Sequence, residues 1–145
     1  MYYFLNDNMQ YSKSGIEHAE INRLDLFKKH HVPAKIVTRV FSMKLENVLQ
    51  QSGIAREDFI NLFEFFCGSM HVATKTFTMN DLSLPVNTTS TRKDNQLQIF
   101  SQGKMLMIIY FRQNSEEISN IQYFDVNGRT LKMTWWDVRG FKCLE

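Results

Sequence analysis

The residues best suited to chemistry lie together in the short stretch Ser14-Gly15-Ile16-Glu17-His18. Ser14 and Glu17 have the spacing of a capping box, in which a serine hydroxyl and a glutamate carboxylate satisfy the free amides of a helix start. A helix start can also hold a phosphate group, and Gly15 would let a ligand come close to the backbone. The stretch therefore predicts either a structural cap or a donor-phosphate site formed by Ser14, Gly15 and Ile16.

Both interpretations of this stretch stay open at the level of sequence. Gly15 stands alone, without the other glycines of a nucleotide-binding loop. The Glu17 carboxylate would also compete with a bound anion for the same amides. His18, in the first turn of the helix, is a candidate contact for an acceptor or another substrate, with an ordinary surface histidine as the alternative. No nucleophile motif or metal-ligand spacing is present, so we assign no catalytic residue and no metal ligand.

The elements around this stretch alternate between strand and helix. Residues 2–5 form a short apolar run typical of a buried strand, and the spacing after Ser14 predicts a helix that ends before Pro33. The β-branched stretch 34–40 predicts a second strand. Two strands joined by such a helix are expected to be parallel, with a right-handed crossover. The helix is expected to bury one apolar face made of Ile16, Ala19, Ile21, Leu24, Leu26 and Phe27.

The remainder of the chain changes from helical to alternating patterns near Met70. Two helices are predicted at 45–51 and 57–66, and the polar stretch 81–95 is expected to be a long loop. Asn127-Gly128 between alternating segments predicts a tight hairpin. Strands are expected at 71–78, 96–100, 105–111, 118–124 and 131–135.

These elements predict an α/β protein, with a partial Rossmann-like unit followed by an antiparallel β-meander. We divide the chain into the start of a Rossmann-like domain at 1–42, a helical linker at 43–69 and the meander at 70–145. One strand–helix–strand pair cannot cover both faces of a parallel sheet. We therefore expect the chain to be the N-terminal part of a longer protein.

The composition excludes several classes of protein. The chain has 145 residues with a formal net charge of +2, and its basic residues are dispersed, which argues against a nucleic-acid partner. Its two cysteines, Cys67 and Cys143, form no paired motif and are expected to be free thiols. The N-terminus lacks the pattern of a signal peptide, and the expected location is the cytoplasm.

Several stretches of the chain resemble bacterial GT-B glycosyltransferases of the poly(glycerol-phosphate) α-glucosyltransferase type. That group includes the accessory-Sec enzymes that glycosylate serine-rich repeat adhesins and the wall teichoic acid glycosyltransferases. The resemblance is most specific over residues 14–38 and looser in the meander. The stretches that carry it are 14–19 (SGIEHA), 22–27 (NRLDLF), 32–38 (VPAKIVT), 61–66 (NLFEFF), 123–125 (YFD) and 137–141 (DVRGF).

The resemblance implies a retaining enzyme that transfers glucose or N-acetylglucosamine from a UDP-sugar, with no further cofactor. The acceptor would be a serine or threonine of a surface protein, or a teichoic acid. The chain would be the start of the acceptor-side domain with an inserted meander, and Ser14, Gly15 and Ile16 would lie near the donor diphosphate. The second domain of such enzymes is missing here, so this chain alone is expected to be inactive.

A second class of function is a non-catalytic interaction module. The exposed edges of a meander can pair with another sheet. The family resemblance likewise implies that the meander mediates assembly, with a co-activator subunit or as a homo-oligomer. Peripheral association with a membrane surface is a further alternative.

Overall fold

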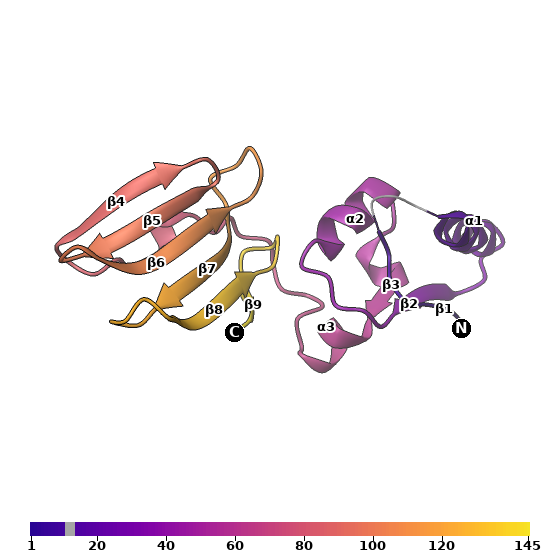
Figure 1. The fold of residues 1–145 in the computed structure, drawn as a ribbon. Coiled ribbons are helices and arrows are strands. Elements are labelled where there is room, and N and C mark those ends of the chain that lie inside the picture. Colours follow the sequence, from indigo (N-terminus) through magenta and orange to yellow (C-terminus); the bar gives the residue numbers. More distant parts are fainter. Residues whose placement is uncertain (11–13) are drawn as a thin grey trace. The chain divides into compact units, whose positions relative to one another are not determined.

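The computed structural model describes residues 1–10 and 14–145, and the chain divides into two compact units, Met1–Ala73 and Thr74–Glu145 (Figure 1). The first unit combines helices with a three-stranded parallel sheet. The second carries a six-stranded antiparallel sheet whose strands follow one another in sequence order. The predicted class, a partial Rossmann-like α/β unit followed by an antiparallel meander, is therefore confirmed.

The first unit begins with the predicted strand–helix–strand arrangement. β1 (Tyr2–Asn6) pairs in parallel with β2 (Ala34–Thr38), and α1 (Gly15–Lys29) joins them. The sheet has the order β1-β2-β3, so β2 is central. The remaining elements of the unit are α2 (Leu45–Ser52), a 3-10 turn (Arg56–Asp58), β3 (Phe59–Asn61) and α3 (Leu62–Phe66).

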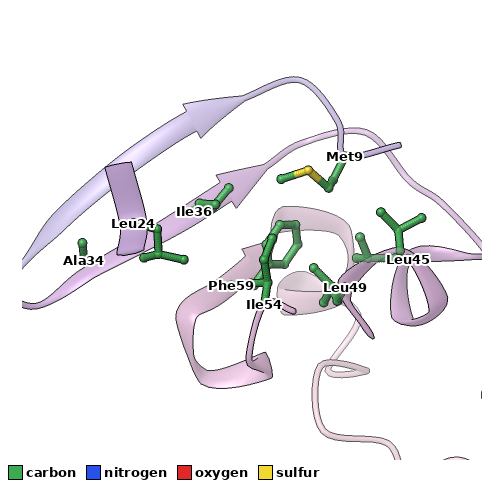
Figure 2. Close-up of a cluster of buried hydrophobic side chains, with 9 residues drawn as sticks. Met9, Leu24, Ala34, Ile36, Leu45, Leu49, Ile54 and Phe59 are labelled. Atoms are coloured by element: carbon green, nitrogen blue, oxygen red, sulfur yellow. The ribbon is translucent and has the colours of Figure 1, made fainter. Parts of the chain in front are cut away.

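The core of this unit lies between one face of the parallel sheet and helices α1 and α2. Phe4, Ile36 and Phe59 are in register across the three strands, and alternation along each strand turns them to the same face. Ile36 and Phe59 are fully buried there. Figure 2 shows the cluster, whose buried members are Met9, Leu24, Ala34, Ile36, Leu45, Val48, Leu49, Ile54 and Phe59.

Helix α1 docks on a different face from the one that its apolar residues predict. Leu24 is buried, and Ile21 and Phe27 pack partly against the core, as expected. Ile16 and Leu26, however, are exposed. The buried stripe instead begins with two glutamates in the first turns, and their place in the fold is described below. The predicted face was therefore wrong at Ile16, Ala19 and Leu26, which are exposed.

The predicted helix at 57–66 was also wrong in its first half, where Glu57 and Asp58 belong to the 3-10 turn and Phe59–Asn61 is a strand. Residues Phe59–Asn61 pair in parallel with β2, and only Leu62–Phe66 is helical. The side chain of Asn61 caps this short helix by accepting a hydrogen bond from the Glu64 amide at 3.2 Å. Pairing with the central strand β2 outweighs the helical spacing of the phenylalanines. The pattern of residues 57–66 alone could not reveal this pairing, because it depends on a strand that is distant in sequence.

The second unit is a meander of six strands. They are β4 (Thr88–Lys93), β5 (Gln96–Ser101), β6 (Lys104–Phe111), β7 (Ile118–Phe124), β8 (Thr130–Trp136) and β9 (Lys142–Leu144). The hairpin turn at Asn127-Gly128 is present, and Asp125 Oδ1 accepts hydrogen bonds from the amides of Asn127 and Arg129. Neighbouring pairs from β5 to β9 each contain a register shift.

Two predictions in this unit need correction. Residues 71–78 form no strand. We call this irregular segment the strap, and its Phe77 packs on the core of the antiparallel sheet. The stretch 81–95 is not a single loop, since it begins at the last residue of a 3-10 turn (Met79–Asp81) and contains the edge strand β4. The side chains of β4 are almost all exposed, so the strand has no buried alternation by which sequence could reveal it.

The strap, which contains Lys75 and Phe77, packs against the turn at residues 137–140 and the strand before it. The Phe77 ring stacks on Trp136 at 4.7 Å between centroids. The Lys75 amide donates to the Arg139 carbonyl at 2.9 Å, and a Cβ on Gly140 would lie 1.6 Å from the Lys75 carbonyl oxygen. Gly140 has a φ of +80°, so both its conformation and its closeness to the strap require glycine.

Candidate functional site

The best candidate site lies at the carboxyl edge of the parallel sheet. The strands of a parallel sheet end at the same edge, which is where ligands bind in open α/β folds. Asn6, Thr38 and Asn61 are in register at the ends of β1, β2 and β3. By alternation they share the face of Phe4, Ile36 and Phe59. The apolar core of this face therefore ends in a polar row.

The polar row is partly tied together by hydrogen bonds. Asn61 Nδ2 donates to Thr38 Oγ1 at 3.0 Å and to the Val40 carbonyl at 2.9 Å. Asn61 and Thr38 are both fully buried, so their bonds satisfy groups that water cannot reach. Asn6 is half-buried, and its Oδ1 accepts from the Asp7 amide at 2.8 Å.

The start of α1 adopts the predicted capping box. The Ser14 amide donates to Glu17 Oε2 at 2.6 Å, and the Ser14 hydroxyl contacts the same carboxylate. The Ser14 side chain in turn accepts from backbone amides of the first turn. The Ser14 hydroxyl is the main cause that lowers the pKa of Glu17, and burial acts in the opposite direction. A negative charge of the protein itself therefore already lies at this helix start.

The other predicted site residues are exposed on the first turn. Gly15, Ile16 and His18 are all accessible, and a Cβ placed on Gly15 would meet nothing within 4 Å. The described residues therefore leave space next to the backbone of Gly15. The capping box is confirmed, while the donor-phosphate role of Ser14, Gly15 and Ile16 and the substrate contact of His18 remain predictions.

Glu20 is the functional candidate that the sequence did not single out. It lies one turn beyond Glu17 on the buried side of α1 and is only 7% exposed. Burial is the main cause that raises its pKa, and a hydrogen bond from the Asn6 side chain and the charge of Arg23 act against it. Two carboxyl groups one turn apart on α1 thus have pKa values displaced in opposite directions, lowered at Glu17 and raised at Glu20.

A cavity of about 460 Å³ opens at the same edge. Asp7 and Arg39 form an exposed ion pair in its wall, with 2.6 Å between Oδ1 and Nε. The hydrogen bond that Arg39 donates to the Asp7 carboxylate is the main cause that raises the pKa of Arg39. The residues around the cavity are Leu5, Asn6, Asp7, Val37, Thr38, Arg39 and Leu62.

This arrangement can bind and orient a polar ligand through hydrogen bonds. Among the described residues, no group of three or more His, Cys, Asp or Glu side chains could hold a metal ion. Within the same residues, no helix has the length and apolar character needed to cross a membrane. Alternation along the two predicted strands could have marked Asn6 and Thr38 individually, whereas Asn61 lies in a segment that the sequence predicts to be helical. Glu20 carries no such signal, because its burial follows from the direction in which α1 docks on the sheet.

Comparison with known proteins finds a curated relative and several solved structures of similar fold. No family model matches the chain. Over 125 residues it is 26% identical to the UDP-N-acetylglucosamine–peptide N-acetylglucosaminyltransferase GtfA subunit of Streptococcus agalactiae, covering 82% of this chain and 24% of that protein. The chain thus spans about a quarter of the length of this curated relative.

Solved structures agree on the fold. A structure of accessory secretory proteins 1, 2 and 3 from Streptococcus pneumoniae matches with a TM-score of 0.72 and 18% identity, over 98% of this chain and 31% of that chain. A GtfA/B complex matches with a TM-score of 0.72 and 16% identity, over 99% and 32% of the respective chains. These structures therefore show that the chain shares its fold with about a third of each of those proteins.

Proposed function

We propose that this chain is part of a retaining glycosyltransferase that transfers N-acetylglucosamine from a UDP-sugar to serine or threonine side chains of a surface protein. The observation that carries the proposal is the sequence relationship to a peptide N-acetylglucosaminyltransferase subunit, which extends over most of this chain. Glucose as the sugar and a teichoic acid as the acceptor are the alternatives within the same reaction class. We place the reaction in the cytoplasm, where nucleotide sugars are made.

In this proposal the chain supplies one wall of the donor site. Ser14, Gly15 and Ile16 would contact the donor diphosphate, and His18 would face the substrate from the first turn. The space that the described residues leave at Gly15 supports this role. The Glu17 carboxylate would have to release the Ser14 amide before a phosphate could take its place. Phosphate binding would therefore weaken as the Glu17 cap strengthens.

The test is a transfer assay with the whole product of the gene that encodes this chain. Purified protein is incubated with UDP-N-acetylglucosamine or UDP-glucose, and with a Ser/Thr-rich peptide or a glycerol-phosphate polymer. We expect labelled peptide with UDP-N-acetylglucosamine. The 145-residue chain alone, assayed in parallel, is expected to give none. Absence of both transfer and hydrolysis for either UDP-sugar would contradict the proposal.

A second candidate function is assembly through the meander. β4 is the first strand of the second sheet, and among the described strands it has a neighbour, β5, on one side only. Its backbone groups on the other side can pair with a strand from another chain. The similar structures include complexes of several subunits. We therefore propose that a homologous co-activator subunit, or a second copy of this chain, binds this unit.

Light scattering coupled to size-exclusion chromatography tests assembly directly. A partner on the sheet would give a mass above the 17.2 kDa of the single chain, either alone or with a co-expressed homologous subunit. A monomer under both conditions would contradict this second function and would leave the transferase proposal untouched.

A further inference from the structure

The edge strand β4 carries a run of hydroxyl side chains. Residues 88–91 read Thr-Thr-Ser-Thr, and nowhere else in the 145 residues do two serines or threonines follow one another. From Thr89 to Lys93 every residue of the strand is exposed. The run therefore places several alcohol groups in water on one regular strand.

β4 presents these side chains on an extended backbone that a second protein can reach. It is the first strand of the second sheet, and among the described strands only β5 pairs with it (Figure 1). Ser90 is opposite the buried Ile99 and so lies on the core side of the sheet. Because side chains alternate along a strand, Thr89 and Thr91 project from the other face.

The hydroxyl groups of Thr89 and Thr91 are not engaged by the fold. Thr88 Oγ1 donates to the Pro85 carbonyl at 3.2 Å, which fixes that side chain. Within the described residues, no hydrogen bond holds the hydroxyl of Thr89 or Thr91. An extended strand with exposed and unengaged alcohol groups has the form of an acceptor peptide.

The end of β4 is anchored, and its own charges are positive. The Arg92 guanidinium donates to both carboxylate oxygens of Glu116, at 2.8 and 2.9 Å, and lies 4.3 Å from the centre of the Phe111 ring. Lys93 follows it, and residues 86–93 contain no acidic residue. The strand is therefore held in place and does not repel the negative diphosphate of a nucleotide sugar.

We propose that Thr89 and Thr91 are modification sites, at which the enzyme transfers N-acetylglucosamine to its own meander. The inference rests on the proposed function, whose acceptors are serine and threonine side chains. In the reaction, the threonine Oγ1 atom forms a bond to the anomeric carbon of the sugar, and the bond between that carbon and the diphosphate oxygen breaks. UDP leaves with the electron pair, and the hydroxyl proton passes to its departing phosphate oxygen. No other co-reactant is needed.

Such a modification would change what the edge of the sheet can bind. Unmodified β4 offers the backbone groups of its open edge to a strand from another chain. A sugar ring on Thr89 or Thr91 would stand beside that edge and obstruct the approach of a partner strand. Self-modification would therefore limit assembly through β4.

The test locates the sugar on the whole product of the gene that encodes this chain. Purified protein is incubated with UDP-N-acetylglucosamine and a Ser/Thr-rich peptide, then digested and analysed by electron-transfer fragmentation, which keeps the sugar on its residue. We expect N-acetylhexosamine on Thr89 or Thr91 as well as on the added peptide. Label on the peptide but on neither threonine would overturn the inference and leave the proposed function standing. Absence of label from both the peptide and the protein would overturn both.

Matched variants assign the acceptor hydroxyls. The double variant Thr89→Val/Thr91→Val keeps β-branched side chains, which favour the strand, and removes only the hydroxyls. We expect complete loss of sugar from β4, with transfer to the added peptide unchanged. Ser90→Ala, on the other face of the same strand, is the control and should keep the label. A label on β4 that survives in the double variant and disappears in Ser90→Ala would contradict the assignment.

Discussion

The two units of this chain cover their sheets to different extents. In the second unit, Ile99, Ile109 and Ile121 are fully buried, and the strap around Phe77 packs against them. In the first unit, α1 and α2 cover one face of the sheet, while Leu5 on β1 is 77% exposed. An antiparallel meander can be covered by a neighbouring segment, whereas a parallel sheet needs helices on both faces. The functional candidate lies in the unit that is less completely covered.

The largest expected effect comes from breaking the core of the first unit alone. Phe59→Ala should cost about 3–5 kcal/mol of unfolding free energy, because it removes a buried aromatic ring and leaves a cavity. The three α-helices lie in the first unit, and both tryptophans lie in the second. We expect the helical circular dichroism signal to melt earlier while the tryptophan fluorescence transition stays in place. Simultaneous shifts of both signals would mean that the units unfold together.

Gly140→Ala should produce the next largest loss, now in the second unit. The new methyl group would collide with the Lys75 carbonyl and would also hold a side chain at positive φ. We expect a cost of at least about 2 kcal/mol, read from tryptophan fluorescence during denaturation. Gly128→Ala is the matched control, since Gly128 has a φ of +78° but open space around its Cβ, and should cost about 1 kcal/mol. An equal loss of unfolding free energy in the two variants would show that the close contact between Gly140 and Lys75 does not contribute to the effect.

Removal of the helix cap should have a smaller and pH-dependent effect on the first unit. Ser14→Ala is expected to cost about 1 kcal/mol at neutral pH. The folded-state pKa of Glu17 is lowered from 4.5, mainly by Ser14, so this stabilisation is present above that pH and is lost as the pH falls through the folded pKa. Thermal melts at pH 7 and pH 3 should therefore show a cost that shrinks in acid. If Ser14→Ala loses the same stability at pH 7 and at pH 3, the ionised Glu17 carboxylate does not contribute to the cap.

The smallest expected effect on unfolding is at the uncovered surface of the first unit. Phe66 on α3 is 81% exposed, so Phe66→Ser should change the unfolding free energy by less than about 0.5 kcal/mol. Exposed apolar residues of this kind favour association, and we expect the variant to self-associate less at high concentration. Analytical ultracentrifugation measures this. A large loss of stability would show that Phe66 is packed in solution.

The sequence predicted the parts of the fold that depend on local patterns. The capping box at Ser14 and Glu17, the hairpin at Asn127-Gly128 and most strands of the meander are present as predicted. The strand Phe59–Asn61 was missed because its pairing with β2 is a tertiary interaction. The edge strand β4 was missed because its exposed side chains carry no alternation.

The candidate site was predicted only in part for a similar physical reason. The helix start is a local feature, so Ser14, Gly15 and Ile16 could be identified as candidates. Glu20 could not, because a glutamate in a helix is normally taken to be exposed. Its burial follows from the direction in which α1 docks on the sheet. The alignment of Asn6 with Thr38 likewise requires the register of two strands that are distant in sequence.

The connectivity of the two sheets also has a consequence for the order in which they form. Each neighbouring pair in the meander is joined by a short turn, so pairing can begin as soon as one hairpin closes. Tyr2 instead meets Ala34 only after α1 has formed between them, which makes loop closure slower. We therefore expect the C-terminal unit to reach its native state first during refolding, although the ribosome completes it last.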